Sequence, residues 1–183
     1  MSIAGTARGD WMQTYTGLAF YPMSPQVEEI DPLDIAHALG MLCRYGGHVS
    51  RFYSVAEHCV LMSEAVSAEN ALWALLHDAT EAYMGDMIRP LKLAMPAYAE
   101  AEDRLMAVIC DRFGLDHAMP AEVKNADNRI LHDERAAYMS TPPLPWKSIE
   151  DVPMLGVPIE GWLPHEAAWR YFDRLLELTG EPT

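Results

Sequence analysis

The chain has 183 residues, half of them hydrophobic and 22% charged, which fits one globular domain with a sizeable hydrophobic core rather than a disordered segment. Thirteen Lys and Arg stand against 27 Asp and Glu, so the formal net charge is −14. This acidity excludes binding of a nucleic-acid polymer through its phosphates, although a small anion could still bind in a local basic pocket.

The N-terminal arm, residues 1–30, is expected to form a short β-hairpin or an extended segment, because residues 11–30 mix β-forming side chains with Gly and Pro. The rest of the chain reads as helical. The first helix should begin after Asp31, an N-cap residue, with Pro32 at its first position. It should run to about Arg44, since two glycines follow shortly afterwards.

Helix-forming stretches bounded by caps, Gly or Pro make up most of the remaining chain. We expect helices over residues 54–66, 71–84, 97–113 and 121–139, and a last one with the amphipathic stripe Ala168, Tyr171, Phe172, Leu175 and Leu176. In the first of these helices, Ser54 and Glu57 have the spacing of a capping box. Pro90 and Pro96 should bracket a loop.

Residues 141–164 contain six prolines and cannot form a helix. This segment is too long for an ordinary connection, so we expect it to pack over the core as a lid or rim, or to form an oligomer contact. The sequence therefore predicts an all-α fold, a single helical domain over residues 1–183 with a small N-terminal arm.

The three cysteines, Cys43, Cys59 and Cys110, are odd in number and form no CxxC pair. They indicate reduced, mostly buried thiols rather than a disulfide framework or a thiolate metal site. The N-terminal residues lack the apolar core of a signal peptide, and no apolar run is long enough to cross a bilayer. We therefore expect a soluble, cytoplasmic protein that does not contact membranes.

Residues 75–86, LLHDATEAYMGD, carry ionisable side chains that lack cationic partners. At 100° per residue, His77, Asp78 and Glu81 fall within about 100° of one helix face. No Lys or Arg occurs in residues 71–86. A solvated face normally mixes both signs of charge, so a bound cation explains this cluster better than solvent does.

Two further residues can join this cluster. Asp127 lies at the edge of the apolar stripe of its predicted helix, where a carboxylate needs an ionic partner or a metal, and Lys124 and Arg129 are the alternative partners. His58 also lies beside an apolar stripe, and by itself it would more often be a hydrogen-bonded core histidine. Together, two imidazoles and two carboxylates form a mixed nitrogen and oxygen site that suits divalent transition ions.

The order His58, His77-Asp78, Asp127 resembles the H…HD…D signature of the HD-domain metal-dependent phosphohydrolases. The segments SVAEH, HDATEAYMGD and ADNR are similar to the short, single-domain branch of that superfamily. This branch includes the YfbR-type 5′-deoxynucleotidases and the DatZ-type phage dATP triphosphohydrolases. The resemblance covers residues 14–139.

The resemblance implies an HD domain with one divalent ion, which could be Co, Mn, Zn, Ni or Mg. The four implied ligands are His58, His77, Asp78 and Asp127. It further implies that Glu81 orients or deprotonates the attacking water and that Asp86 transfers a proton. By residue type alone, Asp86 could equally be a turn residue. The resemblance also implies a homo-oligomer.

Cations near the HD pair are candidates for substrate binding. Arg44 and Tyr45 resemble an Arg-aromatic pair that contacts nucleotide in the YfbR-type enzymes, where the aromatic residue is Trp. Lys92 matches a family lysine that could hold phosphate. The further candidates are Arg89, His48 and Arg51. Each could instead be an ordinary surface cation, and Arg44 could neutralise a helix C-terminus.

The activity that the resemblance implies is hydrolysis of phosphate esters of deoxynucleotides. In the N-terminal half, the run DIAHALGMLCRYGGH…FYSVAEHC within residues 34–59 resembles the phage-type enzymes. This resemblance favours a dNTP triphosphohydrolase, with an adenine deoxynucleotide as substrate and with deoxynucleoside and tripolyphosphate as products. The alternatives are a 5′-deoxynucleotidase acting on dNMPs, a non-catalytic HD module that binds nucleotide or metal, and another enzyme on this scaffold, such as a cyclic-nucleotide phosphodiesterase or a di-iron oxygenase. The presence of Glu81 and all four ligands argues against the non-catalytic module.

Overall fold

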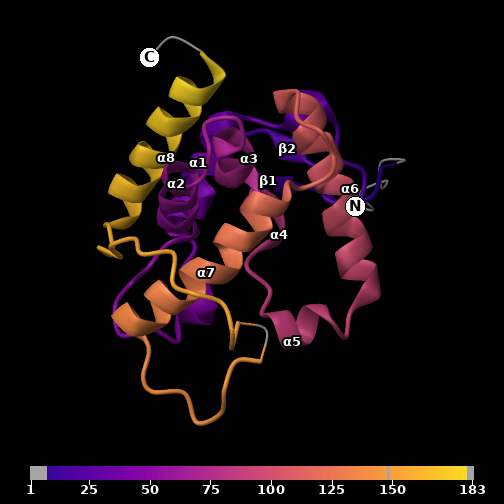
Figure 1. Ribbon diagram of the computed structural model, residues 1–183. Coiled ribbons are helices and arrows are strands. Elements are labelled where there is room, and N and C mark those ends of the chain that lie inside the picture. The colour runs from indigo at the N-terminus through magenta and orange to yellow at the C-terminus, as the bar shows by residue number, and fades with distance from the viewer. Residues whose placement is uncertain (1–7, 148, 181–183) are drawn as a thin grey trace.

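The computed structural model describes residues 8–147 and 149–180 and is helical apart from a small antiparallel hairpin (Figure 1). The predicted all-α fold with a short N-terminal hairpin is therefore confirmed. The elements in chain order are β1 (Met12–Gln13), β2 (Ala19–Phe20), η1 (Val27–Glu29), α1 (Pro32–Met41), η2 (Arg44–Gly47), α2 (Val55–Ala65), α3 (Ala71–Leu76), α4 (Glu81–Met84), α5 (Arg89–Lys92), α6 (Pro96–Phe113), α7 (Ala121–Tyr138) and α8 (Pro164–Thr179). Residues 1–7 of the predicted arm and residue 148 of the proline-rich segment lie outside the described residues.

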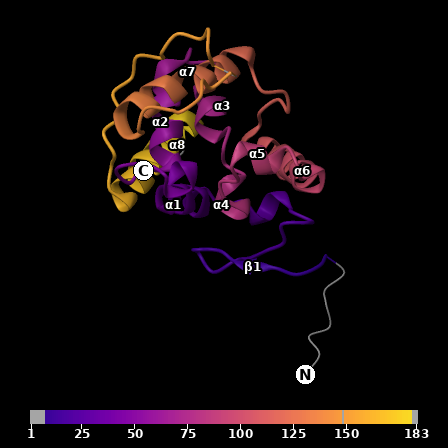
Figure 2. The same ribbon diagram turned by 90° about the horizontal axis from the view of Figure 1, so that it is seen from below.

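Helix α2 is the central element of the bundle. It packs against α1, α3, α7 and α8, and nine of its 11 residues are buried. The hairpin and α7 lie on opposite sides of the bundle (Figure 2). Asp34 of α1 fixes the hairpin, because its carboxylate accepts hydrogen bonds from the backbone N and the hydroxyl of Thr16 at 2.7 and 2.9 Å.

The first helix begins as predicted but ends early. The Asp31 carboxylate accepts from the backbone N of Leu33, which fixes the start of α1. The helix ends at Met41 rather than near Arg44, because the next residues are extended and pair with the chain before α2. In this pairing the backbone N of Arg44 donates to the Tyr53 carbonyl at 2.9 Å.

The predicted capping box is only half correct. The Ser54 hydroxyl accepts from the backbone N of Glu57 at 3.0 Å and caps α2. The Glu57 carboxylate does not return to Ser54. It accepts instead from the backbone N–H groups of Glu160, Gly161 and Trp162, at 2.9, 2.8 and 2.7 Å. Three charge-assisted bonds to a distant segment outweigh the single local bond that the box would offer.

The helix predicted over residues 71–84 is interrupted. Its two parts are α3 and α4, and between them residues 77–80 form tight turns, in which the backbone N of Ala79 bonds to the Leu76 carbonyl at 2.9 Å. The loop predicted between Pro90 and Pro96 is also partly wrong, because α5 occupies its first half.

Residues 139–147 and 149–163, called the strap below, have no helix and run along α7. The Asp133 carboxylate accepts from the backbone N of Leu155 and Gly156 at 2.8 and 3.0 Å, and Glu57 holds residues 160–162 as described. Ile149 and Trp162 of the strap are buried. Two buried carboxylates thus hold the strap on the helices.

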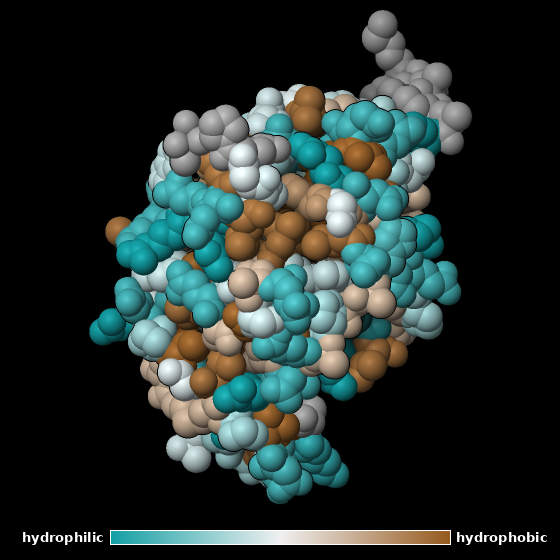
Figure 3. All heavy atoms as spheres, turned by 45° about the horizontal axis from the view of Figure 1, so that its top comes forward, coloured by the Kyte–Doolittle hydropathy of each residue, from teal (hydrophilic) through white to brown (hydrophobic). Residues whose placement is uncertain are grey.

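The surface mixes polar and apolar side chains, with apolar residues gathered near the middle of the face in Figure 3. The large apolar side chains that stay exposed include Trp11, Tyr15, Leu93, Leu163 and Trp169. Within the part of the chain that the structure describes, no helix has the length and apolar character needed to cross a membrane.

Candidate metal centre

Three segments bring imidazole and carboxylate groups together at one point. His58 comes from α2, His77 and Asp78 from the turns after α3, and Asp127 from α7. The Nε2 atoms of His58 and His77 are 3.1 Å apart. Asp78 Oδ2 lies 3.2 Å from His77 Nε2 and 3.6 Å from His58 Nε2, and Asp127 Oδ1 lies 3.8 Å from His58 Nε2. The four predicted ligands therefore converge.

Hydrogen bonds on the outer side of each ring fix where the imidazole protons are. His77 Nδ1 lies 2.8 Å from the Ala74 carbonyl oxygen, which can only accept, so Nδ1 carries the proton. His58 Nδ1 lies 2.7 Å from a carboxylate oxygen of Glu134, and the same argument applies. In the neutral rings both Nε2 atoms then present lone pairs to each other, beside two carboxylates.

This donor set fits a metal ion. Zinc–imidazole bonds are about 2.0–2.1 Å long, so the nitrogens of a tetrahedral site lie about 3.3 Å apart, close to the spacing of the two Nε2 atoms. Arg44 and Lys124 each pair with one of the two carboxylates, and a proton or a metal ion between the two Nε2 atoms would supply further positive charge. The group of His58, His77 and Asp127 can therefore hold a metal ion.

Cys59 and Lys124 each contact one member of the cluster. Cys59 Sγ lies 3.9 Å from His77 Nδ1, and with His77 and Asp78 it forms a second group that could hold a metal. All three thiols are free and two are buried, as predicted. The prediction that no thiolate holds a metal stays a prediction, because the His77 Nδ1 atom nearest Cys59 already bonds to the Ala74 carbonyl. Lys124 Nζ pairs with Asp127 Oδ2 at 2.7 Å, which leaves Oδ1 facing the imidazoles.

The buried carboxylates and imidazoles shift one another's pKa values. Burial opposes the charged form of Asp78, but His77 and other neighbouring cations outweigh it and lower the pKa of this carboxyl far below its usual value. Burial likewise opposes a charged His77, yet the Asp78 carboxylate raises its pKa well above the ordinary value. Burial and nearby Arg44 lower the pKa of His58. The carboxylates therefore favour positive charge at this point, and a divalent cation could supply it in place of a proton on His77.

Glu81 opens α4 one turn beyond Asp78 and is buried. Its Oε2 atom has no hydrogen-bond partner among the described residues. Burial, followed by the charges of Asp78 and Asp86, raises the pKa of Glu81 well above its usual value. An unpartnered buried carboxylate oxygen is costly and points to a group that it would hold.

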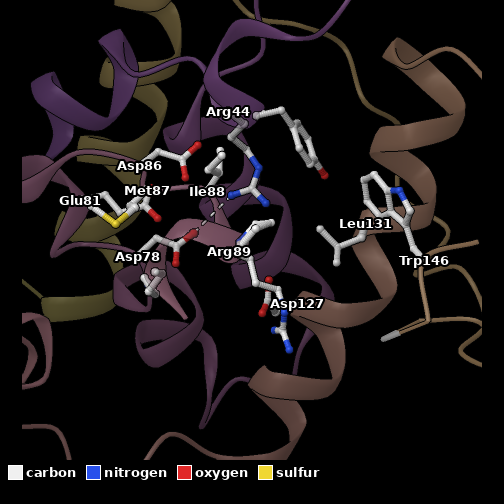
Figure 4. Close-up of a pocket in the computed structure, with 13 residues that line it drawn as sticks. Arg44, Asp78, Glu81, Asp86, Met87, Ile88, Arg89, Asp127, Leu131 and Trp146 are labelled. Carbon is white, nitrogen blue, oxygen red and sulfur yellow. Dashed lines mark hydrogen bonds and ion pairs between the residues drawn. The ribbon is translucent and has the colours of Figure 1, made fainter. Parts of the chain in front are cut away.

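A cavity of about 520 Å³ opens over the cluster (Figure 4). Its lining residues are Arg44, Tyr45, Asp78, Glu81, Asp86, Met87, Ile88, Arg89, Pro90, Lys92, Asp127, Leu131 and Trp146. In Figure 4 the carboxylates of Asp78, Glu81 and Asp86 lie on one side and Leu131 and Trp146 on the other. The cavity therefore has a charged wall and an apolar wall.

The candidate substrate-binding cations fall into two sets. Arg44 and Arg89 line the cavity, as does Lys92, although Lys92 Nζ pairs with Glu102 at 2.7 Å. Among the described residues, Arg89 makes no ion pair. His48 and Arg51 are exposed in the segment before α2 and do not line this cavity. The structure thus brings together ten of the twelve predicted site residues.

Comparison with known proteins identifies relatives of the chain. No protein-family model matches it. It is 41% identical over 143 residues to the uncharacterized protein YfdR of Escherichia coli K12, covering 78% of this chain and 80% of YfdR. The chain belongs to the YfdR family. It is also 39% identical over 126 residues to an uncharacterized protein of Rhodobacter capsulatus, covering 63% of this chain and 64% of that protein.

Two site residues of this YfdR-family member were not anticipated from the sequence. Glu134 of α7 is buried and bonds to His58, and Trp146 of the strap lines the cavity. Glu134 follows Asp127 by seven residues, or two helical turns, so the shared helix face was a signal that could have found it. Trp146 lies in an irregular segment where no periodicity marks an inward position.

Proposed function

We propose that the chain is a metal-dependent phosphohydrolase acting on deoxynucleotides. The observation that carries this proposal is the convergence of two imidazole lone pairs and two carboxylates at one end of a cavity that also has cations and aromatic side chains. Two nitrogen and two oxygen donors favour a transition ion such as Mn²⁺, Co²⁺, Ni²⁺ or Zn²⁺ over Ca²⁺. The resemblance to the HD-domain phosphohydrolases supports the same reading.

When bound, a divalent ion would supply charge that acidifies water and neutralises phosphate oxygens. The free Oε2 of Glu81 accepts the proton of the attacking water, because this atom is buried beside the cluster and has no hydrogen-bond partner among the described residues. Asp86, on the same wall of the cavity, would relay the proton taken up by Glu81 to the leaving group, so that the proton lost by water balances the one gained there. His58, His77, Asp78 and Asp127 hold the ion.

The two walls of the cavity suit the two parts of a nucleotide. Arg89 holds phosphate oxygens, with Lys92 beside it in an ion pair with Glu102, while Trp146, Leu131 and Tyr45 contact the base and sugar. A volume of about 520 Å³ lies in the range of ordinary small-molecule sites. A simple phosphate would leave the apolar wall uncovered, so a nucleotide is the better substrate.

Cleavage of dATP to deoxyadenosine and tripolyphosphate is our preferred reaction, on the strength of the phage-like N-terminal half. Removal of phosphate from a dNMP is the second candidate, and one contact favours it. Lys92 is neutralised by Glu102, which leaves Arg89 as the unpaired cation at this edge of the cavity. One such charge suits a single phosphate group better than three.

The direct test incubates the purified protein with each dNTP and each dNMP in the presence of Mn²⁺, Co²⁺ or Mg²⁺ and identifies the phosphate product. Tripolyphosphate supports the first reaction and inorganic phosphate from a dNMP the second. Glu81→Gln should lose most turnover, whereas Glu100→Gln, an exposed position of α6, should keep it. The proposal fails if no nucleotide is hydrolysed or if the two variants are equally active.

A further inference from the structure

Glu134 is the most enclosed acidic group of the site. Its side chain is 1% exposed, and it lies on α7 two turns after Asp127. Both carboxylate oxygens are used, since one accepts from His58 and Tyr53 and the other from Tyr45 and Arg44. The four contacts are His58 Nδ1 to Oε1 at 2.7 Å, Tyr53 hydroxyl to Oε1 at 2.9 Å, the Tyr45 hydroxyl to Oε2, and Arg44 Nη2 to Oε2 at 3.5 Å.

The bond to His58 acts on the metal side of the site. Because a carboxylate only accepts, it holds the proton of His58 on Nδ1 and aims the Nε2 lone pair at His77. Rotation of the His58 ring would break this short charge-assisted bond, which nothing on the other side of the ring replaces among the described contacts of Glu134. The orientation of one ligand is therefore set before any ion binds.

The bonds to Arg44 and Tyr45 act on the substrate side. Arg44 spans two acids, with Nε 3.3 Å from Glu134 Oε1 and Nη1 3.3 Å from Asp78 Oδ2. Tyr45 has a left-handed backbone with φ of 59°, a conformation that non-glycine residues adopt only when other contacts hold it. Its hydroxyl bond to Glu134 supplies such a contact.

We propose that Glu134 is a positioning residue that orients the metal ligand His58 and the cavity residues Arg44 and Tyr45 at the same time. The substrate half of this inference rests on the proposed function, whereas the metal half does not. One carboxylate then couples the geometry of the ion site to that of the substrate site. This coupling explains why a tyrosine is suitable at position 45, since its hydroxyl reaches the acid.

The test measures the His58 tautomer and Mn²⁺ affinity and does not depend on enzymatic turnover. Nitrogen-15 NMR of the metal-free wild-type protein should show His58 with its proton on Nδ1. Glu134→Gln should shift this tautomer equilibrium and weaken Mn²⁺ binding, measured by calorimetry, by about 10- to 100-fold. The control is Asp133→Asn, which removes a buried carboxylate of the same helix that holds the strap and does not contact the site. It should lower thermal stability but leave the His58 tautomer and Mn²⁺ affinity unchanged.

The outcomes separate the two proposals. A wild-type His58 proton on Nε2 would overturn the inference without any variant, so it stays testable even if Glu134→Gln does not fold. Equal Mn²⁺ affinity in wild type and Glu134→Gln would also overturn it. If Mn²⁺ affinity depends on Glu134 while no nucleotide is hydrolysed, the positioning role stands and the proposed function fails.

Discussion

Replacing Asp78 with alanine should abolish the stabilisation of this protein by divalent metal. Asp78 Oδ2 lies 3.2 and 3.6 Å from the two Nε2 atoms, so the substitution removes a proposed ligand from the middle of the cluster. An ion at 100 times its Kd stabilises the folded state by about 2.7 kcal/mol. The unfolding entropy of 183 residues is about 0.4 kcal/mol/K, which converts this energy to a rise in Tm of about 7 °C.

The assay is thermal unfolding of metal-free protein with and without Mn²⁺, each variant being compared with its own metal-free form. Wild type should show the full rise in Tm, and Asp78→Ala none. Glu81→Gln should keep the rise, because Glu81 is assigned to the proton of water and not to the ion. A similar rise in Asp78→Ala and wild type would refute the ligand assignment, and loss of the rise in both variants would refute the division of roles.

Three other measurements follow from the geometry. Gly40→Ala should lower the free energy of unfolding by about 1–3 kcal/mol, because the added Cβ would lie 2.7 Å from the Ala168 Cβ across the α1–α8 contact. Urea unfolding measures this, and an unchanged urea midpoint would contradict the packing. Trp146→Leu should raise the KM for a nucleotide about 5- to 150-fold through lost stacking, whereas Trp169→Leu on the exposed side of α8 should not. In metal-free protein, burial opposes a charged Glu134, but Arg44 and His58 outweigh it and lower its pKa from 4.5 to about 2. Its stabilisation is present above pH 4.5 and is lost as the pH falls towards 2, so the stability advantage of wild type over Glu134→Gln should shrink by about 3 kcal/mol over that range.

Helix starts could be predicted because their determinants are local. Asp31 and Ser54 each bond to a backbone N–H two or three residues ahead, a pattern visible in the sequence. Helix ends were harder, since α1 stops where its next residues pair with the chain near Tyr53. The hydrogen-bond partners of the Glu57 carboxylate also lie more than 100 residues away along the chain. These contacts have no signature at short range.

The cluster of imidazoles and carboxylates could be predicted because acids and histidines without a cation in residues 71–86 are conspicuous in an apolar stretch. The sequence did not reveal that Arg44, 34 residues away, pairs with Asp78. Proximity along the chain was a poorer guide to the substrate side, since His48 and Arg51 precede the ligand helix closely yet lie outside the cavity. The position of Glu134 two turns after Asp127 could have placed it on the same helix face, but its partners are 76 to 90 residues away and could not be read from the sequence.

Helix α2, with nine of 11 residues buried, has no face turned fully to solvent. Its backbone amides should therefore exchange with deuterium only when the whole protein unfolds. His58 lies in this helix, so one of the groups that could hold a metal should share its slow exchange. Random mutagenesis should accordingly find few positions of α2 that tolerate substitution. Substitutions that weaken metal binding through His58 should be difficult to distinguish from substitutions that impair folding.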